Sequence, residues 1–301
     1  GCIYGRYKNE IWWCPKRRTL ISYKMYKFAL VSQNSMASFV FTLIVAARSH
    51  KKLSAIYCFE IVTGDESISR LKRINKLLKN SSLKFGLYKF FETYIFMIFL
   101  KIFKFFKLIK FSTIEDIANY YDVPFFKFKD VNDKEFIDNI NGLTSNHFSV
   151  FTSGQIVKNS TLKQFNNYPI NCHGSFLPEL RGPAQYIWYP VKDYKYYGIT
   201  FNNLKYEIDS GDILYQKRFE TPENISSFYL HYLIAEKWGI EFNKLIQIIE
   251  FPPKVMKQKK EDITLVSLPD AEAFKILKSK NQKIIKISDA LNILSNLKPI
   301  F

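Results

Sequence analysis

Three residues far apart in the sequence carry side chains that together could activate a carbonyl group. Asn171 and His173 stand at positions i and i+2 of the stretch NCHGSFLPELRGPAQ, and Asp209 follows in the stretch IDSGDI. If 169–173 is the end of a strand, Asn171 and His173 point to the same face of it. A carboxamide, an imidazole and a carboxylate that meet could orient a carbonyl, stabilise an oxyanion and move a proton.

Each part of this pattern is weak on its own. An Asn-x-His pair is more often structural, and Asp-Ser-Gly is a common turn. The residues that follow strengthen the pattern. Pro178 and the Gly-Pro pair at 182–183 force the chain out of the strand, so that Asn171 and His173 are expected at its end. The stretch GIT at 198–200 then enters a further strand, and the turn that carries Asp209 follows it.

The elements that must position these residues alternate between strand-like and helix-like patterns. This alternation predicts an α/β fold with a doubly wound, mostly parallel sheet. Ligands of such sheets bind beyond the carboxyl ends of the strands, which is where Asn171 and His173 are expected. Strands are predicted at 28–32, 53–62, 125–128 and 148–154, and helices from Ser35, after 113 and over 133–143.

Taken together, the motifs resemble the formyltransferase family. That family uses 10-formyltetrahydrofolate and includes the glycinamide ribonucleotide, methionyl-tRNA and sugar N-formyltransferases. The resemblance is strong over 113–220 and weak in 66–112 and in the C-terminal part. The matching residues are Asn171, His173, Ser175, Leu177, Pro178, Arg181, Gly182, Ala184, Gly198, Thr200, Asp209, Gly211 and Ile213.

The resemblance implies roles for the matching residues. Asn171 would position the formyl oxygen, protonated His173 would stabilise the tetrahedral oxyanion, and Asp209 would favour that protonated ring and relay the proton of the attacking amine. Substrate contacts are implied at Ser175, Arg181 and Gly182. Contacts to 10-formyltetrahydrofolate are implied at Ser153, Gly154, Gln155, Ile156, Val157, Ile208 and Gly211.

Two positions depart from the family pattern. The family usually has a His two residues after the Thr, and here that position is Asn202. The residue after the motif His, often Pro or Ala in relatives, is Gly174. The first change puts the contacts of the local loop or of the acceptor in doubt, whereas the second is mild.

The chain divides into three predicted parts. An N-terminal extension covers 1–25, a formyltransferase catalytic domain covers 26–222 with a helical insert at 66–112, and a small α+β appendage covers 223–301. Within the insert, the segment 82–111 is very apolar, but its longest stretch without a charge is 93–100. That is far short of the ~20 residues that a bilayer requires.

Two interpretations of the segment 82–111 stay open. It could be a peripheral membrane anchor, basic and aromatic, or a helical insert packed on the main domain or in a dimer interface. In the second half of the segment a lysine recurs every third residue, at Lys101, Lys104, Lys107 and Lys110. This spacing distributes the charges around a helix and predicts no clean apolar face in that half. We therefore favour the packed insert.

Composition limits the compartment and the partners. The formal charge of +17 comes mostly from Lys spread along the chain, which indicates compositional bias and no specific nucleic-acid partner. Four cysteines without disulfide or metal spacing suit a reducing cytoplasm, at most peripheral to the inner face of the membrane. With four histidines as well, no metal site is predicted.

The acceptor is expected to be the amine of a nucleotide-linked amino sugar, in surface-polysaccharide biosynthesis. Methionyl-tRNA formyltransferases carry a C-terminal barrel of ~100 residues, and only 92 residues (301 − 209) follow Asp209. The stretch LRGPAQYIWYPV also resembles the polysaccharide-type enzymes, in which homodimers are common. The alternatives are a methionyl-tRNA-type activity, a formyl-folate hydrolase, and an inactive relative that binds a membrane or a partner.

Overall fold

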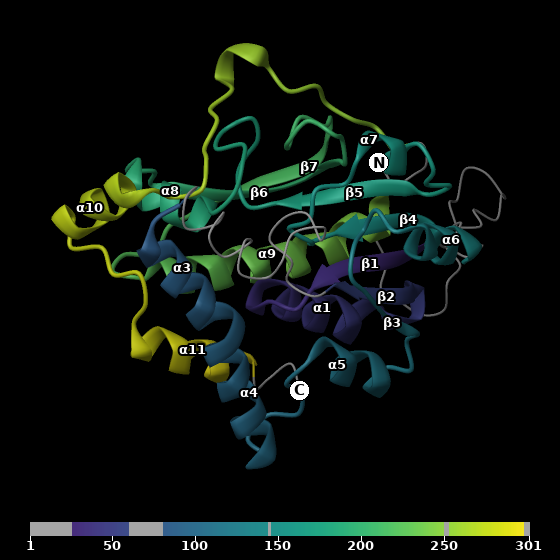
Figure 1. The fold of residues 1–301 in the computed structure, drawn as a ribbon, viewed down its shortest axis with the longest axis horizontal. Coiled ribbons are helices and arrows are strands. Elements are labelled where there is room, and N and C mark those ends of the chain that lie inside the picture. The colour runs from purple at the N-terminus through teal and green to yellow at the C-terminus, as the bar shows by residue number, and fades with distance from the viewer. Residues whose placement is uncertain (1–25, 60–80, 144–145, 250–252, 298–301) are drawn as a thin grey trace, which may run out of the picture.

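The fold is known for most of the chain. A computed structural model describes residues 26–59, 81–143, 146–249 and 253–297 (Figure 1). The predicted N-terminal extension and the first part of the predicted insert, up to residue 80, lie outside the described residues.

Seven strands form one sheet in the order β3-β2-β1-β4-β5-β6-β7. Strands β3, β2, β1, β4 and β5 run parallel to one another, whereas β6 is antiparallel to both β5 and β7. The strand order reverses between β1 and β4, where doubly wound sheets bind their ligands. This topology confirms the predicted α/β fold. The strands are β1 (Lys27–Gln33), β2 (Leu53–Phe59), β3 (Phe125–Phe128), β4 (Asn146–Phe151), β5 (Tyr168–His173), β6 (Tyr196–Asn203) and β7 (Ile213–Glu220).

Several helices begin at a residue whose side chain caps the first turn. Ser35 accepts a hydrogen bond from the Ser38 N–H at the start of α1, and Thr113 forms a capping box with Asp116 at the start of α5. The helices are α1 (Met36–Ser49), α3 (Leu83–Phe90), α4 (Phe96–Phe105), α5 (Ile114–Tyr120), α6 (Lys134–Gly142), α7 (Asn159–Leu162), α8 (Gln185–Val191), α9 (Ser227–Ile248), α10 (Ala271–Ser279) and α11 (Ile287–Leu297), with short turns η1 (His50–Lys52) and η3 (Lys260–Asp262) and the π-helical segment η2 (Phe91–Ile95).

The sheet separates two hydrophobic cores. In β1, Phe28 and Leu30 belong to the larger core, and Ala29 and Val31 belong to the smaller one. This follows from the period of two in a strand that is buried on both faces. Helices α1, α8 and α9 contribute to the larger core, and α6 covers the other face.

The predicted appendage is joined to the catalytic part by this core. Helix α9 packs along α1, and Phe242 of α9 lies 5.1 Å from Phe28 of β1, edge to face. After α9, the strap 253–268 arches over the β6–β7 side of the sheet (Figure 1). The strap contains a bridge between Leu265 and Arg181 of the motif loop. The C-terminal residues therefore contact the loop that the sequence placed at the site.

Candidate active site

Strand β5 ends at His173, as the sequence predicts. It pairs with β6, so that Asn171 lies opposite Asn202 and His173 opposite Thr200. The Thr200 hydroxyl donates to the Ser175 carbonyl at 2.7 Å and accepts from the Leu177 N–H at 3.1 Å. The neighbouring strand therefore shapes the loop that leaves His173.

Asn171, His173 and Asp209 meet at the end of β5. One carboxylate oxygen of Asp209, Oδ1, accepts from Asn171 Nδ2 at 3.0 Å and lies 3.2 Å from His173 Nδ1. The other oxygen, Oδ2, accepts from the Gly182 N–H at 2.9 Å. The turn that carries Asp209 thus lies against both the strand end and the motif loop.

Tight backbone contacts hold Asp209 in this position. Asp209 itself has a φ of 51°, in the left-handed region that Asp tolerates better than most residues. At Gly211, an added Cβ would lie 1.7 Å from the Asn203 carbonyl oxygen. At Gly182, which has a φ of 118°, a Cβ would lie 2.0 Å from the Val266 carbonyl oxygen. Both glycines are required by close backbone approach.

The charge of Asp209 is stabilised within the site. Burial alone would raise the pKa of Asp209, but the nearby His173 ring and the bonds from Gly182 and Asn171 outweigh it, and the pKa is lowered. His173 is 4% exposed, and its Nε2 lies 3.0 Å from the Leu180 carbonyl oxygen. Each ring nitrogen therefore lies near an oxygen atom, Nδ1 near Asp209 and Nε2 near the Leu180 carbonyl.

Two residues predicted to contact substrate have partners within the protein. Ser175 is fully buried, and its hydroxyl donates to the Glu179 carbonyl. The Arg181 guanidinium donates through Nε and Nη2 to Gln258 Oε1, at 2.9 and 2.7 Å. In this conformation both side chains support the loop, and Gly182 supports Asp209 through its amide.

The predicted folate loop, 153–157, follows β4, the neighbour of β5 in the sheet. Its Gly154 N–H donates to Gln33 Oε1 at 3.0 Å, and Gln155 Oε1 accepts from the Val131 N–H at 2.9 Å. Val157 is buried in the smaller core, whereas Ile156 is 65% exposed. Ile208, beside Asp209, is also exposed. Within the described parts of the chain, no hydrogen bond joins this loop to Asn171, His173 or Asp209.

Sequence reasoning missed Gln258, in the strap 253–268. Its Nε2 donates to the carbonyl oxygens of Asp209 at 2.8 Å and Gly211 at 2.7 Å, while its Oε1 holds Arg181. Gln258 therefore ties the Asp209 turn to the motif loop. No local signal marks it, because it lies in the polar stretch KQKKED, 49 residues (258 − 209) beyond Asp209.

Asn202 also belongs to the site. It is 1% exposed, and its Oδ1 accepts from Asn171 Nδ2 at 3.2 Å. The position where the family usually has a His thus contacts the Asn of the predicted trio. The backbone of His173 is fixed from another side, since its carbonyl accepts from Trp238 Nε1 of α9 at 3.0 Å.

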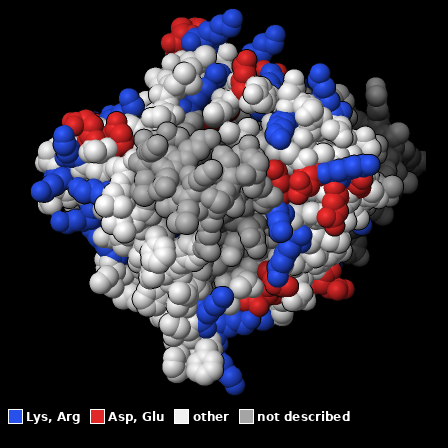
Figure 2. All heavy atoms as spheres, in the orientation of Figure 1, with Lys and Arg blue, Asp and Glu red and all other residues white. Residues whose placement is uncertain are grey.

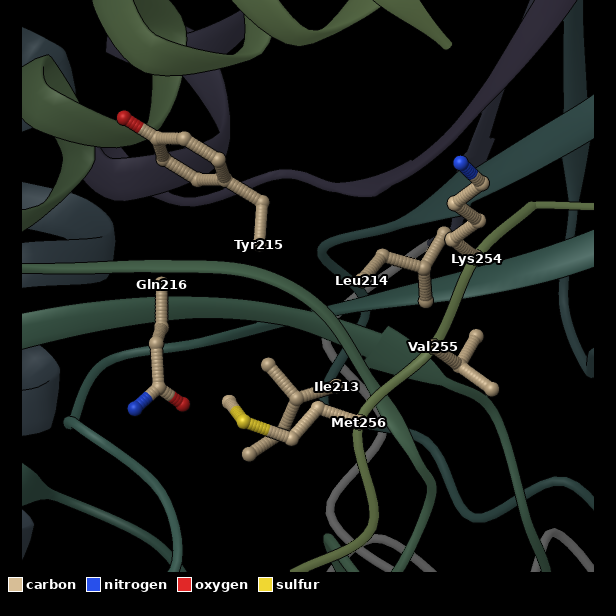
Figure 3. Close-up of a pocket in the computed structure, with 7 residues that line it drawn as sticks. All are labelled: Ile213, Leu214, Tyr215, Gln216, Lys254, Val255 and Met256. Carbon is tan, nitrogen blue, oxygen red and sulfur yellow. The ribbon is translucent and has the colours of Figure 1, made fainter. Parts of the chain in front are cut away.

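An open pocket of about 380 Å³ lies between β7 and the strap (Figure 3). Asn171, His173 and Asp209 do not line it. Its lining comes from Ile213, Leu214, Tyr215 and Gln216 of β7 and from Lys254, Val255 and Met256 of the strap. Within the described parts of the chain, we find no group of three His, Cys, Asp or Glu side chains that could hold a metal ion.

Residues 106–235 match the family model described as "Formyl transferase". The methionyl-tRNA formyltransferase of Clostridium perfringens (strain SM101 / Type A) is 26% identical over 192 residues, covering 62% of this chain and 60% of the relative. The chain spans about half to 60% of the length of the curated relatives it matches first.

Two solved structures share the fold. The N-formyltransferase from Helicobacter canadensis, solved with folinic acid and dTDP-3-aminofucose, has a TM-score of 0.50 at 15% identity, covering 92% of this chain and 81% of its own. The phosphoribosylglycinamide formyltransferase from Anaplasma phagocytophilum has a TM-score of 0.51 at 14% identity, covering 81% and 100%. These two structures show the formyltransferase fold, and the domain match supports the resemblance to the formyltransferase family that the sequence motifs predict.

Proposed function

We propose that this protein transfers a formyl group from 10-formyltetrahydrofolate to a primary amine. One observation carries the proposal: Asn171, His173 and Asp209 converge within hydrogen-bond distance at the carboxyl end of β5. They lie in the part of the chain that matches the formyltransferase model. The folate donor supplies the formyl carbon that the amine attacks.

The residues present fit such a donor. The loop 153–157 leaves Gly154 and the side chain of Ile156 exposed, after the strand next to β5. An exposed backbone with an apolar side chain can contact a flat heterocycle and hydrogen-bond to its edge. The Asp209 turn adds the exposed side chain of Ile208. These are the residues that would hold the donor.

The chemistry needs a stabilised oxyanion and a path for one proton. In the transfer, the bond from the formyl carbon to the folate nitrogen breaks and a bond to the amine nitrogen forms. Asn171 would orient the formyl oxygen, and His173 would stabilise the negative charge that develops on it. Asp209 would hold the ring and accept the amine proton, directly or through water, and the folate nitrogen takes up a proton as it leaves.

We propose a nucleotide-linked amino sugar as the acceptor. Three observations support this choice: the stretch LRGPAQYIWYPV, the net charge of +17, which suits an anionic nucleotide, and the likeness over 92% of the chain to a structure solved with dTDP-3-aminofucose. The second candidate is methionyl-tRNA, because several curated relatives are methionyl-tRNA formyltransferases.

The test is a mass-spectrometric assay with 10-formyltetrahydrofolate and, separately, a panel of nucleotide amino sugars and methionyl-tRNA. We expect a formylated amino sugar with the wild-type protein and none with Asp209→Asn. Asp212→Asn, a neighbouring carboxylate that lies 3.7 Å from Lys205, is the matched control and should retain activity. Formylation of methionyl-tRNA alone would overturn the sugar acceptor, and turnover of neither acceptor would overturn the proposed transfer.

A further inference from the structure

A continuous helical arm, residues 83–105, runs along one side of the molecule and ends at its lower tip (Figure 1). It consists of α3, η2 and α4. The proposed formyl transfer uses none of its residues. None of the helices in the described part of the chain is long and apolar enough to cross a membrane.

The inner side of the arm is fixed to the body of the protein. Phe91 and Phe96 each lie 5.2 Å from the ring of Phe228 in α9, edge to face. Glu92 is fully buried, and its Oε1 accepts from the Met36 N–H at the start of α1 at 3.0 Å. Near the tip, Lys104 pairs with Asp116 of α5 at 2.6 Å. The arm therefore presents its outer side in a fixed orientation.

The outer side of the arm carries exposed apolar side chains along its whole length. Phe105 is 81% exposed and Phe106 is 65% exposed, at the tip. Exposed Lys101 and Lys107 lie among the apolar residues in the second half of the arm, as their spacing predicts. The outer face, as we use the term, comprises Leu83, Leu87, Phe90, Tyr94, Ile98, Phe99, Ile102, Phe105, Phe106 and Leu108, each at least 44% exposed.

The exposed charges that the segment 83–111 itself contributes are all positive. Within 83–111 the only carboxylate is Glu92, and it is buried. Lys101 and Lys107 are exposed beside the apolar tip and have no carboxylate partner among the residues described. The lower end of Figure 2, where Figure 1 places α4, shows white surface next to blue Lys and Arg atoms.

We propose that the outer face binds the surface of a membrane that contains anionic lipid. Apolar and aromatic side chains bordered by lysine are the features that let a helix lie in the headgroup region. The negative surface potential of such a membrane complements Lys101 and Lys107. A second copy of this chain fits less well, because two outer faces brought together would place like charges near one another.

The test is co-sedimentation of the whole protein with vesicles of phosphatidylcholine, alone or mixed with phosphatidylglycerol. We expect binding to the mixed vesicles, weakened by salt, and little binding to phosphatidylcholine alone. The double variant Phe105→Ser/Phe106→Ser should lose about tenfold or more in affinity for the mixed vesicles, because it removes two large apolar side chains. Lys101→Gln/Lys107→Gln should lose the preference for phosphatidylglycerol.

The control variant is Ile287→Ser/Leu291→Ser, on α11, since Ile287 is 81% exposed, like Phe105. It should bind as the wild type does. Equal binding of the tip variant and the wild type, or equal binding to both kinds of vesicle, would overturn the proposal. A wild type that ignores vesicles but forms a dimer, with a monomeric tip variant in sedimentation velocity, would assign the outer face to a second copy.

Discussion

Removal of the Gln258 side chain should loosen the Asp209 turn. Gln258 makes two bonds to the carbonyls of that turn and accepts two N–H groups of Arg181. The two neutral bonds are worth about 1–3 kcal/mol together, and the bond from the charged Arg181 about 1.5–3 kcal/mol. Because Gln258 is only partly buried, we expect Gln258→Ala to cost slightly less than the lower end of the two ranges together, about 2 kcal/mol of unfolding free energy.

The assay combines thermal unfolding with steady-state formyl transfer. A loss of about 2 kcal/mol corresponds to a fall in Tm of roughly 4–8 °C. The kcat should fall by about tenfold to a hundredfold, since small displacements of a catalytic carboxylate are costly. Gln258→Glu keeps the acceptor for Arg181 but loses both N–H groups, so its kcat should also fall.

Lys257→Ala, at an exposed neighbouring position, is the control and should match the wild type. If Gln258→Ala keeps both the Tm and the kcat of the wild type, the strap does not position Asp209. A fall in Tm with an unchanged kcat would mean that Gln258 supports the fold alone.

Three further predictions concern the site itself. Because the pKa of Asp209 is lowered in the folded protein, its charge contributes its full stability above the ordinary carboxyl pKa of about 4. The Tm difference between wild type and Asp209→Asn should therefore be constant at neutral pH, begin to shrink below about pH 4 and disappear as the pH falls through the lowered pKa; a difference that is unchanged in strong acid would contradict this. Asn171→Ala should lower kcat by ~10²–10³, while Asn202→Ala should cost less, because Asn171 keeps its bond to Asp209; equal losses in kinetic assays would refute that order. Gly211→Ala should destabilise the protein by several degrees in Tm, because its Cβ would overlap the Asn203 carbonyl, and an unchanged melting curve would show that the turn adapts.

The sequence relatives and the solved structures point to different acceptors. Several curated relatives are methionyl-tRNA formyltransferases, whereas the structure solved with an amino-sugar nucleotide is similar over more of the chain. The family model matches 106–235, a range that includes Asn171, His173 and Asp209. The assay with both acceptors separates these two candidates.

The sequence alone determined the elements and the three residues of the candidate site. Strand and helix periods are local, as are the caps at Ser35 and Thr113, so they are readable without the fold. The end of β5 at His173 was likewise marked by the Pro and Gly residues that follow it. The predicted domain boundary at 222–223 and the roles of the loop 153–157 stay predictions.

The tertiary structure decided what depends on contacts between distant residues. Gln258 reaches Asp209 because the strap returns over the sheet, and Glu92 is buried because α1 offers it an unpaired N–H. No periodicity encodes such contacts, since they join segments whose separation in the chain is unrelated to their distance in space. The exposure of Phe105 and Phe106 has the same origin: an apolar residue is buried or exposed according to what the rest of the fold places beside it.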